Sequence, residues 1–232
     1  MITILLFAVT MCLSLWAMYR VKSVYNRFSQ IPASSGATGA EVAAAILDRA
    51  GIHDVSIVEM DEMLGDHYDP LQKRLVLSEQ NFHGRSLAAL GVAAHECGHA
   101  IQHHIAYAPL HWRMAAVGIT TFANQVLMWL PIVGIFTGLI RPYTAAWILA
   151  VAWGVIMLFN LVTLPVEFDA SRRAKVILAD MGFIGTPEEM SGVKKTLDAA
   201  GWTYVAAFIT SLAYFLYHLL PLILGGSRSR DE

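Results

Sequence analysis

The chain has 232 residues, of which 56% are hydrophobic and only 15% carry a charge, and its formal net charge is -2. Its mean hydropathy is +0.52, so we expect an integral membrane protein. The small net charge and the absence of a basic tail argue against nucleic acid as a partner, and two distant cysteines, Cys12 and Cys97, argue against a disulfide framework.

The first apolar run covers residues 2–19 and contains no charged side chain. Arg20, Lys22 and Arg27 follow it, whereas a secretory signal peptide has its positive charge before the apolar run. We therefore predict an uncleaved transmembrane anchor over residues 1–20, with its N-terminus outside the cell and Arg20 in the cytoplasm.

A small α+β region of zincin type is predicted next, over residues 21–113. Residues 31–37 are rich in Pro, Ser and Gly and form a connector, and residues 38–50 have the pattern of an amphipathic helix that Gly51 ends. Short strands are expected at 55–60 and 74–77, with a turn at 66–70. An exposed edge of such a sheet could hold a peptide substrate in extended form.

A metal-binding motif, His95-Glu96-Cys97-Gly98-His99, lies in a helix that is predicted to begin near Ser86. The four-residue spacing places His95 and His99 one turn apart on one face, where two imidazoles can bind one ion. Glu96 lies beside them and is the candidate general base. Zinc suits this set, because a catalytic zinc keeps three protein ligands and one open position. A chance match in a chain of this composition is expected roughly once in a hundred chains.

Two further apolar segments, residues 114–140 and 144–165, predict a transmembrane hairpin. Asn124, Gln125 and Asn160 are expected to hydrogen bond between helices. Residues 166–202 are predicted to form two polar helices, one ending near Gly182 and one ending near Gly201. A last span over residues 203–224 precedes a tail at 225–232. The expected fold is thus a mainly α integral membrane protein with about four transmembrane helices and a small catalytic region at the membrane face.

The distribution of positive charge predicts the orientation of the spans. Placing residues 20–113 and 167–201 on one side of the membrane collects 13 of the 16 Lys and Arg residues there. The positive-inside rule then predicts a multi-pass protein of the cell membrane whose active site faces the cytoplasm.

The hairpin returns the chain to the side of the motif, where Glu167 follows the second span. Glu167 is the best candidate for the third ligand, giving one Zn²⁺ ion held by two His and one Glu. His67 and His83 are alternative donors from loops. His103 lies about 12 Å along the helix from the first ligand, too far to share the ion. Ile105 stands where the metzincin pattern would require its third His, so that class is excluded.

The anchor, the H-E-C-G-H-A-I-Q-H segment, the hairpin and the N-L-V-T-L-P-V-E-F-D-A-S-R-R-A segment carry a family resemblance over nearly the whole chain. Together they resemble the bacterial membrane-bound neutral zinc metallopeptidases of the YugP-like family and, more distantly, the HtpX and Ste24 membrane zinc proteases. The resemblance implies a bacterial zinc enzyme with the three ligands named above and Glu96 as catalytic base. In contrast to HtpX, Ser171 rather than Asp stands four residues after the glutamate, and the nearby acid is Asp169. Asp169 and Ser171 are therefore both candidates for orienting the metal-binding histidines.

We therefore expect a zinc metalloendopeptidase that cleaves peptides or membrane proteins at the interface between the lipid bilayer and the cytoplasm. Candidates for stabilising the oxyanion are Arg172, Arg173, His67 and Tyr68, although the two arginines could instead bind lipid head groups. Two other functions stay open: a zinc-binding membrane scaffold or regulator, against which the free carboxylate of Glu96 argues, and a hydrolase of a non-peptide amide. No sequence feature selects an oligomeric state.

Overall fold

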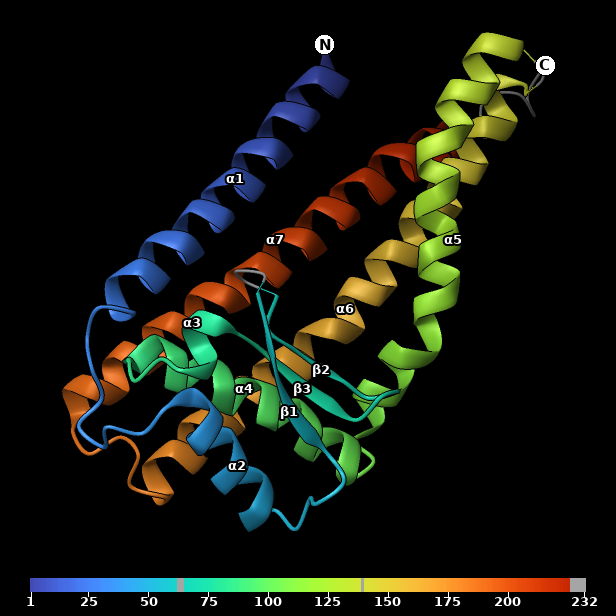
Figure 1. Ribbon diagram of the computed structural model, residues 1–232. Helices are drawn as coiled ribbons and strands as arrows, with labels where there is room; N and C mark the ends of the chain where they lie inside the picture. The colour runs from blue at the N-terminus through green and yellow to red at the C-terminus, as the bar shows by residue number, and fades with distance from the viewer. Residues whose placement is uncertain (62–64, 139, 226–232) are drawn as a thin grey trace. The chain divides into compact units, whose positions relative to one another are not determined.

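The computed structural model describes residues 1–61, 65–138 and 140–225, and the chain is mainly helical (Figure 1). This confirms the predicted class, a mainly α membrane protein with one small sheet. In chain order the elements are α1 (Ile2–Phe28), α2 (Gly39–Arg49), β1 (Ser56–Met60), β2 (His67–Asp69), β3 (Arg74–Ser78), α3 (Glu79–Phe82), α4 (Leu87–His104), α5 (Ala108–Thr137), α6 (Pro142–Asp180) and α7 (Pro187–Gly225).

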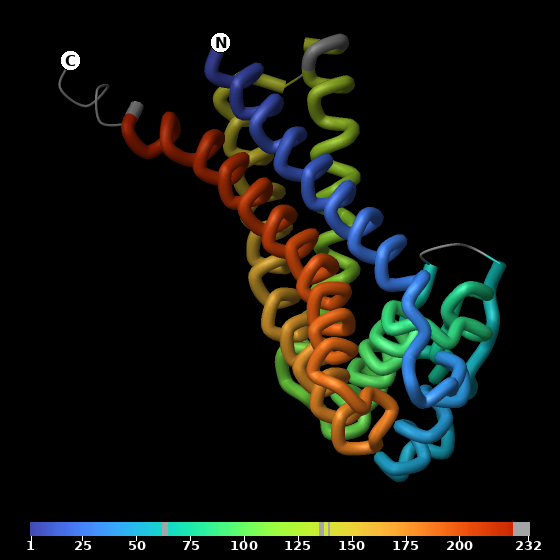
Figure 2. The backbone as a smooth tube through the Cα atoms, turned by 90° about the vertical axis from the view of Figure 1, so that its left-hand side faces the viewer, coloured from blue at the N-terminus to red at the C-terminus, as the bar shows by residue number. Residues whose placement is uncertain are grey.

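Four of the described helices, α1, α5, α6 and α7, are long and apolar enough to cross a membrane, which confirms the predicted number of spans. They can be followed as long continuous coils in Figure 2. A transmembrane helix needs about 20 residues, but α6 and α7 have 39 residues each. Each of these two helices is therefore long enough to contain both an apolar span and a polar extension.

The polar extensions correct the predicted helix boundaries. Separate polar helices were expected after Pro165 and before Gly201, but α6 and α7 continue through both residues. A glycine inside a helix costs only about 1 kcal/mol relative to alanine. At Gly201 the missing side chain also makes room for a neighbour, because a Cβ atom there would lie 3.1 Å from Cε1 of Phe168. The change from apolar to polar sequence therefore changes the environment of each helix without ending it.

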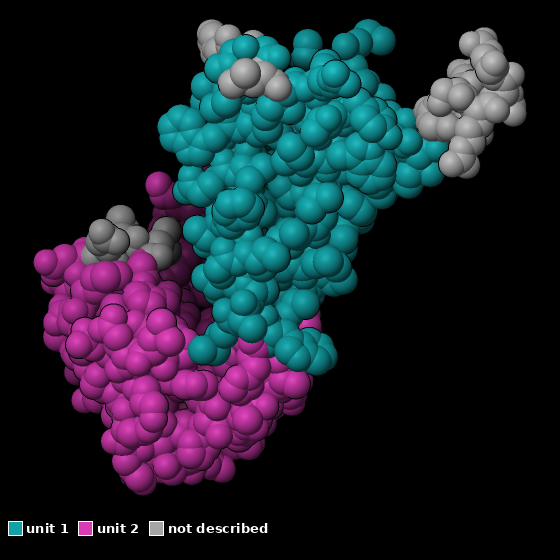
Figure 3. Space-filling model, turned by 90° about the vertical axis from the view of Figure 1, so that its right-hand side faces the viewer, with its two compact units in different colours: residues 1–14, 112–164, 204–232 teal, residues 15–111, 165–203 magenta. Residues whose placement is uncertain are grey.

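Contacts divide the chain into two compact units, which Figure 3 shows in different colours. Unit 1 comprises residues 1–14, 112–164 and 204–232, and unit 2 comprises residues 15–111 and 165–203. In unit 1, the Asn160 side-chain amide donates to the Ala207 carbonyl at 3.2 Å and to the Ser211 hydroxyl at 3.1 Å, which confirms the expected bond between helices for Asn160. Gln125 instead accepts from the Trp129 ring N–H of its own helix at 3.1 Å. The rings of Trp153 and Tyr214 also stack, with centroids 4.5 Å apart.

Unit 2 contains the three-stranded sheet, in the order β1-β3-β2. Strand β3 pairs parallel to β1 and antiparallel to β2. The expected strands are confirmed as β1 and β3, but the turn predicted at 66–70 is wrong, because residues 67–69 form β2 and the turn covers 70–73. The Asp69 carboxylate accepts from the backbone N–H groups of Leu71 and Gln72, so this residue begins the turn instead of ending it.

Helix α2 confirms the predicted amphipathic helix together with its ends. The hydroxyl of Thr38 accepts from the Glu41 N–H at 3.2 Å, and the Glu41 carboxylate accepts from the Thr38 N–H at 2.7 Å. This capping box satisfies two N–H groups that the helix itself leaves without partners. Just beyond the last turn, Gly51 has φ +69°, a conformation that glycine adopts without strain.

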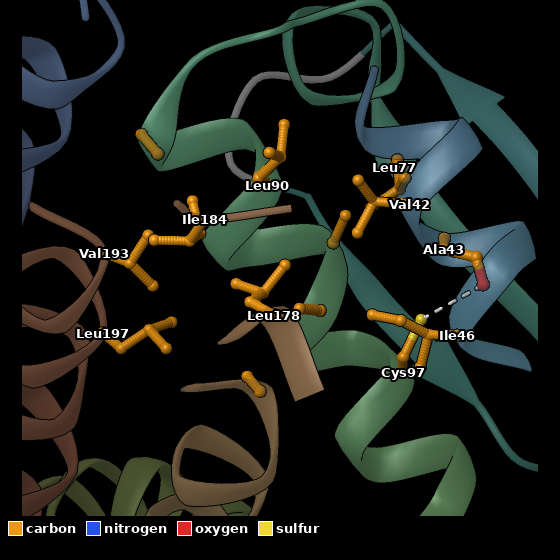
Figure 4. Close-up of a cluster of buried hydrophobic side chains, with 14 of the residues drawn as sticks. Val42, Ala43, Ile46, Leu77, Leu90, Cys97, Leu178, Ile184, Val193 and Leu197 are labelled. Carbon is orange, nitrogen blue, oxygen red and sulfur yellow. Dashed lines mark hydrogen bonds between the residues drawn. The ribbon is translucent and has the colours of Figure 1, made fainter. Parts of the chain in front are cut away.

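The core of unit 2 lies where α2, β3, α4, α6 and α7 meet (Figure 4). Leu75 and Leu77 alternate along β3 and are both fully buried, as expected of a strand with one face in a core. The thiol of Cys97 on α4 points to the Ala43 carbonyl of α2 at 3.7 Å. Cys97 is thus a packing residue on the face of α4 away from the two histidines, and its burial raises the pKa of the thiol.

Helices α4 and α6 approach each other closely at Gly98. A Cβ atom at Gly98 would lie 2.8 Å from the carbonyl oxygen of Ala170 and 3.0 Å from its Cα, both of which are backbone atoms that cannot rotate away. Ala170 itself is fully buried. Glycine at position 98 is therefore what allows the motif helix to lie against the first polar turns of α6.

We expect Gly98→Ala to destabilise the protein despite the higher helix propensity of alanine. Overpacking costs about 1–3 kcal/mol, against about 1 kcal/mol gained from propensity, and each net kcal/mol lowers Tm by about 2–4 °C in a protein of this size. The control is Gly118→Ala in α5, where nothing lies within 4 Å of the added Cβ. Thermal unfolding in detergent compares the two variants. Equal Tm values would contradict the proposed close packing.

Candidate metal centre

Helix α4 presents the two motif histidines from one face. The helix begins where the Ser86 hydroxyl accepts from the Ala89 N–H at 3.2 Å, as the sequence predicted. From that start, His95 and His99 fall one turn apart, and their ring centroids lie 4.8 Å apart with the rings nearly perpendicular. The two side chains converge because their positions on the helix differ by only about 40°.

Helix α6 supplies the carboxylate that completes the cluster. The Oε2 atom of Glu167 lies 3.3 Å from Nε2 of His95 and 3.5 Å from Nε2 of His99. One ligand atom from each of the three residues lies within 4.8 Å of the others. Zinc bonds of about 2.0–2.1 Å in a tetrahedron place neighbouring ligand atoms about 3.3 Å apart, close to the two distances seen here. The donor set and its spacing therefore fit a zinc ion.

The remaining ring nitrogens of both histidines are held by neutral polar side chains. Nδ1 of His95 lies 3.1 Å from the Ser171 hydroxyl of α6, and Nδ1 of His99 lies 3.0 Å from the Gln102 side-chain oxygen. Such hydrogen bonds orient ligand imidazoles and fix which nitrogen faces a metal. Sequence reasoning considered Ser171 for this task but missed Gln102. The sequence pattern that indicates contact between Gln102 and His99 is their spacing of three residues, which places both side chains on the same helical face.

Asp169 is linked to His99 through the side chain of Gln102. Its carboxylate accepts from the Gln102 amide at 3.0 Å and from Arg173 at 2.6 Å, and it also pairs with Arg172. Both arginines are thus engaged with an acid of their own helix. The structure brings Asp169 into contact with Gln102, and no hydrogen bond between Asp169 and either motif histidine is among those of the described residues.

The electrostatic environment of the cluster favours positive charge. Burial of His99 opposes its protonation, but the hydrogen bond that its ring donates to Glu167 and the negative charges of Glu96 and Glu167 outweigh burial and raise the pKa of His99. The same field attracts a divalent cation, which would replace the proton on Nε2.

Glu96 differs from the other acids of the site. Only 7% of its surface is exposed, yet among the described residues it has no hydrogen-bonding or ion-pair partner. Its charge nevertheless acts on His99, the neighbouring candidate ligand. Glu96 is thus a carboxylate near the cluster whose oxygens are not committed to holding the fold.

The other candidates from the sequence have partners outside the three-residue cluster. His67 hydrogen bonds to the Gly65 carbonyl at 2.7 Å, and His83 lies 3.3 Å from the Glu59 carboxylate. The Tyr68 hydroxyl lies 2.8 Å from Nδ1 of His103. Burial and nearby negative charge raise the pKa of Tyr68 to about 12, so its O–H stays protonated at neutral pH.

Comparison with known proteins agrees with this geometry. Residues 3–223 match the model of a family described as "Putative neutral zinc metallopeptidase". The chain belongs to this family. It is also 41% identical to "Putative membrane protease YugP" of Bacillus subtilis (strain 168), over 232 residues that cover all of both chains. No solved structure matches the chain. The predicted YugP-like family is therefore confirmed, and the distant likeness to HtpX and Ste24 stays a prediction.

Family membership implies zinc, and the cluster of His95, His99 and Glu167 offers the donors for it. We expect Glu167→Ala to lower bound zinc from near one equivalent to a small fraction, because the two histidines would lose the anionic third donor. The control is Glu189→Ala, which removes an acid that binds Ser34 and the Gly185 N–H in another part of unit 2. Metal analysis of the purified proteins gives the result. Unchanged zinc in Glu167→Ala would point instead to His67 or His83.

Proposed function

We propose that the protein is a membrane-embedded zinc metalloendopeptidase with a gluzincin-type site, in which His95, His99 and Glu167 hold one zinc ion and Glu96 is the general base. The observation that carries the proposal is the combination of a three-donor cluster with an uncommitted carboxylate beside it. A structural zinc site usually has four protein ligands and no use for such a carboxylate. The family and relative described above supply the reaction class, peptide hydrolysis.

Zinc held by the three donors would supply Lewis acidity for polarising a peptide carbonyl. Glu96 accepts a proton from the attacking water while the oxygen of that water forms a bond to the carbonyl carbon. The same carboxyl group then returns the proton to the amide nitrogen as the carbon–nitrogen bond breaks. The second proton of the water also ends on the amine, so the products are a carboxylate and an ammonium group, and Glu96 ends in its starting state.

We propose that Tyr68 is a donor for the oxyanion that forms during attack. Its support is chemical: the O–H stays protonated at neutral pH and is oriented by His103, which is one turn beyond His99 on α4. Arg172 and Arg173 are weaker candidates for this role, because both bind the Asp169 carboxylate. A zincin-like arrangement in which the sheet edge holds an extended substrate also belongs to this proposal.

We further propose that the site faces the cytoplasm at the membrane interface. The support is the charge distribution of the sequence, since the segments that carry the motif and Glu167 also carry 13 of the 16 Lys and Arg residues. Polar residues flank both motifs, which favours cleavage at the interface over cleavage in mid-membrane.

We expect Glu96→Gln to lower kcat for hydrolysis of an unfolded protein such as casein by about 10²–10⁴-fold, because the amide cannot take up a proton. Bound zinc should remain near the wild-type level, since Glu96 is not one of the three donors. A matched control is Glu79→Gln, which removes a similar charge from the short helix α3. Turnover equal to wild type in Glu96→Gln would contradict the assigned role. Zinc binding without cleavage of any peptide by the wild type would favour the scaffold function.

A further inference from the structure

Gln102 is a fully buried amide with three hydrogen-bond partners. Its oxygen lies 3.0 Å from Nδ1 of His99, and its nitrogen donates to the Val166 carbonyl at 2.8 Å and to the Asp169 carboxylate at 3.0 Å. The side chain thus connects α4, which carries two candidate ligands, to the turn of α6 that carries the third.

The partners decide which end of the amide faces His99. A backbone carbonyl and a carboxylate held by Arg173 can only accept hydrogen bonds, so both must receive the two protons of the Gln102 nitrogen. The Gln102 oxygen is then the atom that faces His99. An amide turned by 180° would place its oxygen against two acceptors, which is repulsive.

This orientation determines the state of the imidazole. Because the Gln102 oxygen can only accept, Nδ1 of His99 must carry a proton and donate it. In the neutral ring, Nε2 then holds the lone pair, and this is the nitrogen that lies 3.5 Å from Glu167. A ring in the other tautomer would present an N–H group to the metal position and could not bind a cation there.

We propose that Gln102 is a positioning residue that locks His99 in its metal-binding tautomer, with Val166 and Asp169 fixing the orientation of the amide. The inference rests on the zinc site of the proposed function, but not on its peptidase activity. Ser171 does not supply this control at His95, because a hydroxyl can either donate or accept. Gln102 is thus the side chain at the site whose own partners allow only one proton arrangement.

Three variants separate this role from a purely structural one. Gln102→Met keeps the length of the side chain but loses all three hydrogen bonds. Gln102→Glu keeps an acceptor for His99 but loses both donated bonds and places a carboxylate near Asp169. Asn81→Leu removes a different buried amide, which accepts from Tyr25 and donates to Asp66 outside the cluster.

The measurements are the zinc dissociation constant of each purified full-length protein, by competition with a chromogenic chelator, and Tm of the metal-free form. We expect zinc affinity to fall about 10–100-fold in Gln102→Met, the usual effect of losing such a support, and to stay within about threefold of wild type in Gln102→Glu. In Asn81→Leu, we expect a lower Tm with unchanged zinc affinity.

Two results would overturn the inference. One is wild-type zinc affinity in Gln102→Met, and the other is an equal loss of affinity in Gln102→Glu and Gln102→Met, which would mean that affinity only follows stability. Zinc affinity and Tm are both measured without a substrate. If the wild type binds zinc and cleaves nothing, the proposed function fails while this inference stands. If the wild type cleaves peptides but Gln102→Met keeps wild-type zinc affinity, this inference fails while the proposed function stands.

Discussion

The close approach of α4 and α6 is the constraint on which the candidate site depends. Gly98 lies between the two motif histidines, and a side chain there would meet the backbone of Ala170. Ala170 is three residues after Glu167, so the same approach that excludes a Cβ atom brings the carboxylate within 3.5 Å of both imidazoles. The contact joins segments about 70 residues apart. A glycine inside the motif is therefore a requirement of helix packing.

The polar groups around this contact also stabilise it. Gln102 is fully buried and Ser171 is mostly buried, and each faces a ring nitrogen that would otherwise lose its hydrogen bond to water. An unpartnered buried polar group costs about 1–3 kcal/mol, so the helices can pack closely only if these side chains find each other. Asp169 extends the same network to Arg173 near the surface. Packing and orientation of the ligands thus rely on the same hydrogen bonds.

The sequence predicted the local features well because their causes are local. Helix caps such as Thr38 and Ser86 and the one-turn spacing of the motif depend on neighbouring residues only. The uninterrupted helices were missed because Gly201 matters through the ring of Phe168, a partner that no local pattern reveals. Local spacing shows only that Gln102 can reach His99; its orientation depends on Val166 and Asp169, which lie more than 60 residues away and could not be paired with it from the sequence. Strand β2 was missed because its three residues are mostly polar.

The balance of charge explains why a divalent cation suits the cluster. With Nδ1 protonated on His99, the ring is neutral when Nε2 is free to bind. Glu96 and Glu167 are both buried, and their negative charges both act on His99, so they also attract a cation to the cluster. Loss of one acid would leave the region less attractive to the cation even where that acid is not a donor. Glu96→Gln should therefore lower the affinity for zinc slightly while bound zinc stays near the wild-type level, and Glu167→Ala should lower the affinity far more.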